Sequence, residues 1–411
     1  MNPARAIADL RELAASTGGP DGARRVCWTP EWEAAREFLR ERLASLGGSV
    51  EVSVDPAGNL WAVLPGRSPE TVVLGSHVDS VPAGGWLDGA LGVMGALEVL
   101  RGLAGASSPA ERTVALVDWA DEEGARFGRS LLGSSAFAGS LDIEAVRELR
   151  DAEGVALPDA LGAHGVAVDE MPTAGEGRLD SLCAYLELHI EQCPVLEAEG
   201  QPCAAVVGCV GVERHRLVFT GAAAHAGTTP MDRRADAGVA AARVMAGLPD
   251  IASRHGGVCT AGQLGLEPGI ATAVAGRAEL AVDQRHLDAG ALAAMLADAV
   301  ALWESAAASE NCSVKAERIW SIEPVPFHPG LVRAAREACV DAGGRDEPLP
   351  SGALHDAAEL ARVVPAAMVF SSSVGGVSHS PAEDTTEADL ERALEAYGAL
   401  ATRVIAEGVP S

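Results

Sequence analysis

The sequence is short of basic and of aromatic residues. Lys and Arg number 31 against 58 Asp and Glu, which gives a formal net charge of −27, and aromatic residues make up 4% of the chain. Because nucleic acids and anionic membranes are bound by basic surfaces, the charge argues against both as partners. With few large rings available, the packing is expected to use the abundant small residues in closely set helices and strands.

The chain also lacks a paired cysteine motif and a long apolar run. None of its eight cysteines forms a C-x-x-C pair, which argues against a thiolate zinc site or a redox motif. The cysteines are scattered through apolar segments and are expected to be free thiols in a reducing compartment. The N-terminus is typical of an amphipathic helix rather than a cleaved leader, and no window approaches a membrane span. These features predict a cytoplasmic protein.

The length of 411 residues and the 48% of apolar residues predict a packed protein with more than one domain. Strand-like apolar runs alternate with helical patterns. Strands are expected at residues 71–76, 113–118, 183–189 and 366–371, and helices at 31–46, 89–103, 331–342 and 387–407. Such alternation is typical of an α/β fold with a mostly parallel sheet.

The middle of the chain has a different pattern. Strands are expected at 216–220, 278–285 and 312–319, with a further one near 258–264, and helices at 235–248 and 289–308. This order indicates a small α+β unit inserted into the larger domain. A proline cluster at residues 324–329 suits a hinge at the end of the insert.

Four segments place potential metal ligands directly after predicted strands. They carry His77, Asp79 and Asp88; Glu122 and Glu123; His189 and Gln192; and His379. Ligand sites in open α/β sheets lie at the carboxyl ends of strands. Taken singly, each residue has an ordinary structural explanation: Asp88 as a helix cap, Glu122 and Glu123 as a solvated acidic loop, and His189 as a core histidine. Together the four segments favour a hydrolytic zinc site.

Counting ligands gives a complete two-metal site. One metal would be held by His77, Asp88 and His189, and the other by Asp88, Glu123 and His379. Asp88 then bridges the metals, Asp79 orients His77, and Glu122 remains free as a general base. A water between two such metals ionises near neutral pH, with its pKa lowered from about 15.7 to about 7.

In this order the four motifs resemble the di-zinc aminoacylase and peptidase superfamily. They are most similar to its amidase, hydantoinase and carbamoylase branch, which holds N-carbamoyl-L-amino-acid hydrolases, allantoate amidohydrolases and β-ureidopropionases. The similarity covers nearly the whole chain and includes residues 55–59, 121–135, 189–192 and 221–236. It implies a di-zinc catalytic domain at residues 1–212 and 328–411. A ferredoxin-like dimerisation and lid domain at 213–327 would be inserted between these parts.

The resemblance also implies roles that spacing alone does not show. His225 would enter the active site of the partner subunit in a homodimer and polarise the scissile carbonyl, although its local sequence is typical of an exposed loop histidine. Arg285 would bind the substrate carboxylate, again across the subunit interface, although an arginine after a strand usually forms a surface ion pair. Gln192 would lie near the carbamoyl end. Zinc is the expected metal, but His and carboxylate ligands also accept manganese, cobalt or nickel.

Three positions depart from the family pattern, and all are expected near the substrate. Thr272 stands where the family has a substrate-contacting Asn, Leu354 replaces a glycine that approaches the substrate, and Cys193 replaces the glycine after residues 189–192. Lost hydrogen bonds or filled volume can change substrate preference by about 10- to 1000-fold.

The sequence therefore predicts a metal-dependent amidohydrolase, with a small molecule bearing a carboxylate and an N-carbamoyl group as substrate. Glu122 would take a proton from the attacking water and deliver it to the leaving nitrogen. Allantoate or another ureido compound, an N-acyl amino acid and a dipeptide are alternative substrates. A non-catalytic protein on an inherited hydrolase fold is disfavoured, because all five ligands and Glu122 are present.

Overall fold

A computed structural model describes all residues 1–411, and the chain divides into two compact units. Unit 1 consists of Met1–Gly208 and Phe327–Ser411, and unit 2 of Cys209–Pro326. The smaller unit is thus an insertion between two segments of the larger one.

Unit 1 is built on a nine-stranded sheet, in which one two-residue strand, Val325–Pro326, comes from the last residues of unit 2. In spatial order the strands are β15 (Val325–Pro326), β8 (Cys203–Cys209), β17 (Ala366–Ser371), β7 (Leu182–Ile190), β5 (Ser68–His77), β6 (Arg112–Trp119), β4 (Leu60–Leu64) and β3 (Glu51–Val54), with β16 (Leu349–Ser351) beside β8. The four central strands β17, β7, β5 and β6 are parallel. β8, β4 and β3 are antiparallel to their neighbours, so the sheet is mixed around a parallel centre.

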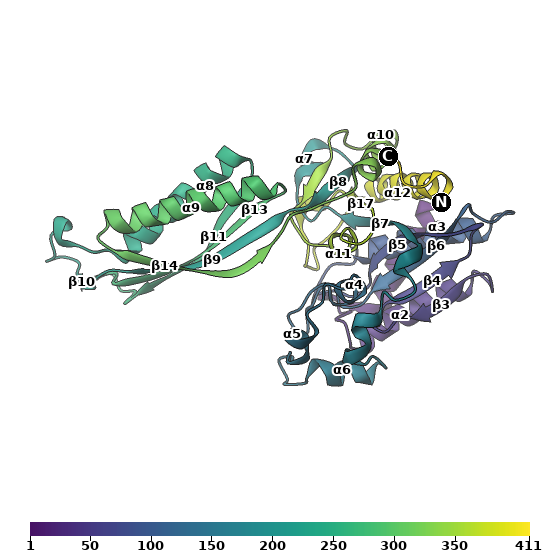
Figure 1. Cartoon of the computed structure of the whole chain (residues 1–411), viewed down its shortest axis with the longest axis horizontal. Coiled ribbons are helices and arrows are strands. Elements are labelled where there is room, and N and C mark those ends of the chain that lie inside the picture. The colour runs from purple at the N-terminus through teal and green to yellow at the C-terminus, as the bar shows by residue number, and fades with distance from the viewer. The chain divides into compact units, whose positions relative to one another are not determined.

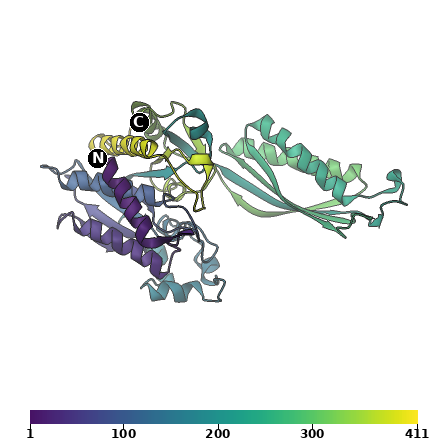
Figure 2. The same ribbon diagram turned by 180° about the vertical axis from the view of Figure 1, so that it is seen from behind.

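Helices pack on this sheet and tie the two segments of unit 1 together. The longer helices are α1 (Pro3–Thr17), α2 (Pro30–Ala44), α3 (Ala90–Ala104), α10 (Pro329–Asp341) and α12 (Glu387–Glu407). α3 packs against β5, β6 and β7, and α12 packs against α1 and β17, so the two ends of the chain meet (Figure 2). The N-terminus of α12 is capped, because the Thr386 side chain accepts a hydrogen bond from the Asp389 amide at 3.1 Å.

The remaining elements of unit 1 are short. They are the hairpin β1 (Gly18–Gly19) and β2 (Gly22–Ala23), the helices α4 (Leu132–Phe137), α5 (Ile143–Arg147), α6 (Leu157–Ala163), α7 (Val195–Glu199) and α11 (Asp356–Leu360), and the single turns η1 (Val168–Thr173), η2 (Leu179–Ser181) and η4 (Val374–Gly376). Four of them, α4, α7, α11 and η4, directly follow a strand of the sheet.

Unit 2 is a four-stranded antiparallel sheet covered on one face by two helices (Figure 1). Its elements are β9 (Gly211–Thr220), α8 (Ala237–His255), β11 (Val258–Glu267), β13 (Arg277–His286), α9 (Ala289–Ser309) and β14 (Ser313–Ile322), with the small pair β10 (Ala224–His225) and β12 (Ala273–Val274) and the turn η3 (Met231–Arg233). The strand order β11-β13-β9-β14 is that of a ferredoxin-like fold. The strand expected near 258–264 is therefore confirmed.

α9 is long and apolar enough to cross a membrane by length and composition alone. Its buried side chains, which include Met295, Ala299 and Trp303, join the core between α8 and the sheet. Core helices pass the same test, so this helix is weak evidence for a membrane span. The prediction that no segment would approach a membrane span is nevertheless wrong for α9, because its many Ala residues raise its mean hydropathy.

Candidate active site

The predicted metal ligands converge because the four central strands of unit 1 run in parallel. β5 ends at His77, β6 leads into the loop with Glu122 and Glu123, His189 lies at the end of β7, and β17 leads into the loop with His379. The carboxyl ends of parallel strands share one edge of the sheet. The geometry therefore brings side chains from four distant segments to a single place.

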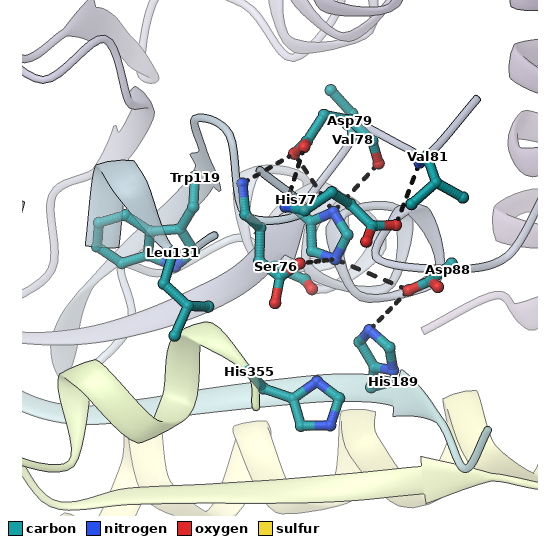
Figure 3. Close-up of polar contacts among 12 residues, drawn as sticks. Ser76, His77, Val78, Asp79, Val81, Asp88, Trp119, Leu131, His189 and His355 are labelled. Atoms are coloured by element: carbon teal, nitrogen blue, oxygen red, sulfur yellow. Dashed lines mark hydrogen bonds and ion pairs between the residues drawn. The ribbon is translucent and has the colours of Figure 1, made fainter. Parts of the chain in front are cut away.

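Asp88 lies at the centre of this group, and its two carboxylate oxygens face different histidines. Its Oδ1 lies 3.1 Å from His189 Nε2 and 3.8 Å from His77 Nε2, as Figure 3 shows. Its Oδ2 lies 3.3 Å from His379 Nε2, which is also 3.3 Å from Glu123 Oε2. The two oxygens of one carboxylate thus belong to two different clusters, which is the geometry of a bridging ligand.

Each cluster fits a divalent cation. In the groups His77, Asp88, His189 and Asp88, Glu123, His379, one ligand atom per residue lies within 4.8 Å of the others. His77 Nε2 is buried without a hydrogen-bond partner, and such an orphaned nitrogen is expected where a cation completes the site. Imidazole and carboxylate donors suit zinc and several other divalent ions. These residues can therefore hold two cations.

The local backbone is shaped for this arrangement. Gly89 begins α3 with φ of +63°, and a Cβ at this position would meet the His77 ring at 2.4 Å. Gln192 and His379 also have positive φ, at 58° and 52°. Non-glycine residues with positive φ are uncommon and concentrate at functional sites.

The electrostatics reflect acids and imidazoles buried together. Burial alone would lower the pKa of His77, but the charges of Glu122, Asp79 and Asp88 outweigh it and raise that pKa well above its usual range. Burial would raise the pKa of Asp88, but hydrogen bonds and charges from His189 and His379 hold it well below.

Glu122, the predicted general base, lies beside the first cluster. Its Oε2 lies 3.5 Å from His77 Nε2, and the residue is 7% exposed. Burial, reinforced by the charges of Asp356 and Glu123, raises the pKa of Glu122 well above its usual range. Burial and the Asp88 charge raise the pKa of Glu123 to about 7. Strongly shifted carboxyls of this kind are common where acid-base catalysis takes place.

Asp79 connects the loop after β5 to the loop after β6. Its Oδ1 lies 3.4 Å from His77 Nδ1, as expected for a residue that orients the ring. The same carboxylate also accepts hydrogen bonds from the backbone amides of Glu122, at 3.3 Å, and Glu123, at 3.2 Å. Asp79 therefore contacts both His77 and the backbone of Glu122 and Glu123, which is more than the orientation of His77 that the sequence predicts.

Glu383 is a residue that the sequence reasoning missed. It is 2% exposed, and its Oε1 accepts hydrogen bonds from the amides of Leu87 and Asp88, both at 3.0 Å. Its Oε2 accepts a hydrogen bond from Ser378 at 3.1 Å. A Cβ at Gly85 would meet this carboxylate at 2.0 Å. Glu383 thus ties the Asp88 loop to the His379 loop, and its position four residues after His379 was the available signal.

Glu187 and His355, which the sequence reasoning did not identify either, lie near His189. Glu187 is fully buried and accepts hydrogen bonds from Ser76 at 2.7 Å and from the Ala357 amide at 3.0 Å. The His355 ring centroid lies 4.3 Å from that of His189, and both labelled rings are visible in Figure 3. Because side chains alternate along a strand, Glu187 shares a face with His189, and this spacing could have identified it.

Of the predicted substrate-side residues of unit 1, Gln192 contacts a predicted metal ligand, and Leu354 is the neighbour of His355, whose ring packs against His189. Gln192 Nε2 donates hydrogen bonds to Asp88 Oδ2 at 3.0 Å and to Ser378 at 3.1 Å. Leu354 directly precedes His355 and is half-buried. Cys193, which like Leu354 departs from the family pattern, donates its thiol to Glu191 Oε1 at 3.0 Å. The positions that differ from the family pattern in unit 1 therefore adjoin the site.

The other predicted substrate residues belong to unit 2, where they fall into two places. His225 lies in β10 opposite Ala273 of β12, and the Thr272 carbonyl accepts a hydrogen bond from the amide of Ala226 at 2.9 Å. His225 and Thr272 are thus exposed neighbours. Arg285 lies near the other end of β13, eight residues beyond Arg277, which corresponds to about 26 Å along the strand.

Comparison with known proteins gives matches over nearly the whole chain. The family model described as peptidase family M20/M25/M40 matches residues 73–403. The chain is 37% identical over 386 residues to an N-carbamoyl-L-amino acid amidohydrolase of Geobacillus stearothermophilus, with 93% of each chain covered. It is 34% identical over 396 residues to the allantoate amidohydrolase of Bacillus subtilis, with 94% of this chain and 93% of the other covered.

A solved structure agrees with these matches. The crystal structure of an amidase of the hydantoinase/carbamoylase family from Burkholderia multivorans superposes with a TM-score of 0.89 at 34% identity, over 99% of this chain and 98% of that one. The sequence matches and the structural match therefore point to the same family.

Proposed function

Because this chain belongs to peptidase family M20/M25/M40, we propose that it is a metal-dependent amidohydrolase that cleaves the N-carbamoyl group of an N-carbamoyl-L-amino acid or a similar small carboxylate. It is a hydrolase of carbon–nitrogen bonds in linear amides, like the relatives that it matches at 33–37% identity. Allantoate is the second candidate substrate, favoured by the match to an allantoate amidohydrolase.

The observation that carries the proposal is the pair of clusters joined by Asp88, with Glu122 beside one of them. Oδ1 of Asp88 faces His77 and His189, while Oδ2 faces His379. A buried carboxyl with a raised pKa at 3.5 Å from a ligand nitrogen is suited to proton transfer.

In the proposed mechanism, this chain's own residues position the reactants and move the proton. Two divalent cations held by the clusters would polarise the scissile carbonyl and lower the pKa of a water from about 15.7 to about 7. Glu122 accepts a proton from the attacking water and then donates it to the leaving nitrogen. Asp79 fixes the positions of Glu122 and His77, because its carboxylate accepts a hydrogen bond from the Glu122 amide and lies 3.4 Å from His77 Nδ1. The products are the amino acid and carbamate, and carbamate decomposes to ammonia and carbon dioxide.

The substrate residues of unit 2 support an active site shared between two copies of the chain. We assign Arg285 to the substrate carboxylate and His225 to the carbonyl oxygen that becomes negative during attack. Because these residues lie near opposite ends of the unit 2 sheet, one compact substrate cannot contact both on the same unit. A homodimer in which each site receives His225 from one copy and Arg285 from the other resolves this. This refines the expectation that both residues act across the interface.

Zinc is the proposed metal, with manganese, cobalt and nickel as alternatives that the same donor set accepts. A cytoplasmic location is proposed from the cysteines, because none of the eight forms a disulfide and a reducing compartment preserves thiols.

A substrate panel tests the proposed function. The purified protein, supplied with zinc, manganese or cobalt, is assayed for product release from N-carbamoyl, N-acetyl and N-formyl amino acids, dipeptides and allantoate. The proposal expects the highest kcat/KM for an N-carbamoyl compound and no turnover after metal removal. A preference for dipeptides or N-acetyl amino acids would instead assign the chain to peptide or acyl-amino-acid hydrolysis.

A further inference from the structure

The sheet of unit 2 has an uncovered face with a cavity beside Arg285. The cavity has a volume of about 510 Å³, and its charged lining residues are Arg214, Asp283 and Arg285. The other residues that line it are uncharged. Because Val282 and Leu280 pack into the core under α8 and α9, alternation along β13 directs Asp283 and Arg285 to the opposite face.

The three charged residues form one hydrogen-bonded row with Asp283 in the middle. Arg285 Nε donates to Asp283 Oδ1 at 2.8 Å. Arg214 donates to Asp283 Oδ2 twice, from Nε at 2.8 Å and from a terminal nitrogen at 2.7 Å. Arg214 and Asp283 are direct cross-strand partners in the register of β9 and β13. Each oxygen of Asp283 is therefore used by a different arginine.

The charges in this row decide what the cavity attracts. Arg285 and Asp283 alone would form a neutral pair with little attraction for an anion. Arg214 supplies a second positive charge, so the row has a net charge of +1. Since the three side chains are 20–38% exposed, their field reaches the cavity, where a bound carboxylate would meet both guanidinium groups.

Arg214 is also held in place from its other side. Its guanidinium carbon lies 5.2 Å from the ring centroid of Trp320, which is the partner of Arg214 in the register of β9 and β14. A cation over an aromatic face is attracted by the ring, which limits the freedom of the arginine. Arg214 thus lies between Trp320 and Asp283 in a defined position.

Arg216 provides a contrast on the same face. It lies two residues further along β9 and pairs with Glu317 at 2.6 Å and with Glu279 at 3.8 Å. With two acids around one arginine, that group carries no excess positive charge. Among these neighbouring networks, the Arg214 row is the cationic one.

We propose that Arg214 is a specificity-determining residue, which keeps the Arg285–Asp283 pair cationic so that the cavity binds the carboxylate of the substrate. This inference rests on the proposed function and deepens it, because it assigns the selection of carboxylate-bearing substrates to a three-residue row. Asp283 is a positioning residue in this row, since it orients Arg285 through Nε.

The test compares a charged substrate with its neutral analogue in a set of charge variants. The substrates are N-carbamoylglycine and N-carbamoylglycinamide, which differ in the carboxylate alone. The variants are Arg214→Met, with no net charge in the row; Arg214→Lys, which keeps the charge; and Arg214→Met/Asp283→Asn, which restores a net charge of +1. Arg216→Met is the matched control on the same strand.

Arg214→Met should raise KM for N-carbamoylglycine by about 10-fold with little change in kcat, and should leave the amide almost unaffected. Arg214→Lys and the double variant should recover most of the loss, because the asparagine side chain of the double variant would still accept a hydrogen bond from Arg285. Arg216→Met should behave as wild type. An equal loss for both substrates, or a double variant no better than Arg214→Met, would overturn the inference.

The test distinguishes a wrong proposed activity from a wrong role of Arg214. If the wild type hydrolyses no N-carbamoyl compound, the proposed activity is wrong, and calorimetric binding of the same two compounds then tests the row by itself. Tighter binding of N-carbamoylglycine than of the amide, lost in Arg214→Met and kept in Arg216→Met, would support it. Equal affinities would contradict it. Circular dichroism and the melting temperature of each variant separate a binding defect from misfolding.

Discussion

The residues expected to perform the chemistry and those expected to choose the substrate are built differently. In unit 1, His77 and His189 are each 1% exposed, and Asp79 and Glu383 join separate ligand loops through several hydrogen bonds. In unit 2, His225 and Thr272 are exposed, and the small pair β10 and β12 holds them. The predicted metal ligands are therefore held by the core of one unit, whereas His225 and Thr272, two of the proposed substrate contacts, lie on a surface with few constraints.

None of the three positions that depart from the family pattern is a predicted metal ligand. A change at a buried ligand would leave other buried charges unpaired, which is strongly destabilising. Under the proposed function, a change at Thr272 or Leu354 alters a contact with the substrate and leaves the ligand clusters intact. Changes of this kind could therefore direct the same catalytic unit to different ureido substrates.

The largest expected effect is the loss of the general base. Glu122→Gln should lower kcat by about 1000-fold, because Gln cannot accept the proton of the attacking water. The metal content should stay at the wild-type level, since Glu122 belongs to neither ligand group. Steady-state kinetics and elemental analysis check both statements, with the exposed Glu144→Gln as control. Retention of more than a few per cent of activity would show that Glu122 is not the base.

The second prediction concerns the shared site. His225→Ala should reduce kcat by about 100-fold, as expected for the loss of one group that stabilises the oxyanion. If His225 acts in the partner's site, mixing His225→Ala with Glu122→Gln after dissociation should restore activity. Random pairing makes half of the dimers mixed, each with one intact site, so about a quarter of wild-type activity is expected. Absence of any recovery in verified mixed dimers would place His225 outside the partner's site.

The third prediction tests how the ligand loops are held. Glu383→Gln should weaken metal affinity by about 10-fold, because an amide is a poorer acceptor for the backbone amides of Leu87 and Asp88. Competition with a chelator measures this affinity. Glu387→Gln is a suitable control, since Glu387 is an exposed glutamate paired with Arg11 at 2.8 Å. Unchanged metal affinity in Glu383→Gln would mean that the loops are fixed without this contact.

The smallest effects are expected on the substrate side. Thr272→Asn and Leu354→Gly should each change the ratio of kcat/KM between two N-carbamoyl amino acids of different size by about 10-fold. Leu354→Gly should favour the larger side chain, because it removes an isobutyl group near His355. Metal content should be the same in all proteins. If neither ratio moves, the departures from the family pattern do not determine substrate preference.

Much of unit 1 could be predicted from sequence because its central strands are apolar and end in polar residues. The runs at 71–76 and 366–371 became β5 and β17, and the polar residues after them mark the carboxyl edge of the sheet. β8, which lies outside the parallel centre of the sheet, was missed for a physical reason. It is a run of seven mostly small residues, and its short pattern does not separate a strand from other buried segments.

Contacts between distant segments could not be predicted in the same way. Glu383 binds the amide of Leu87 across 296 residues, and its position four residues after His379 does not show that contact. The opposite placement of His225 and Arg285 likewise depends on the pairing of β10 with β12 and of β13 with β9 and β11, which sequence periodicity does not fix. Local patterns thus predicted the candidate ligands, and tertiary structure was needed to identify the residues that hold them.

The central claim is that hydrolysis depends on two cations bridged by Asp88. The most direct measurement follows N-carbamoyl amino acid hydrolysis while metal is titrated into the metal-free protein, with bound metal per chain determined at each point. Activity should be absent without metal and reach its maximum at two ions per chain, and Asp88→Asn should hold fewer ions and stay inactive. Hydrolysis by the metal-free protein, or full activity in Asp88→Asn, would contradict the account.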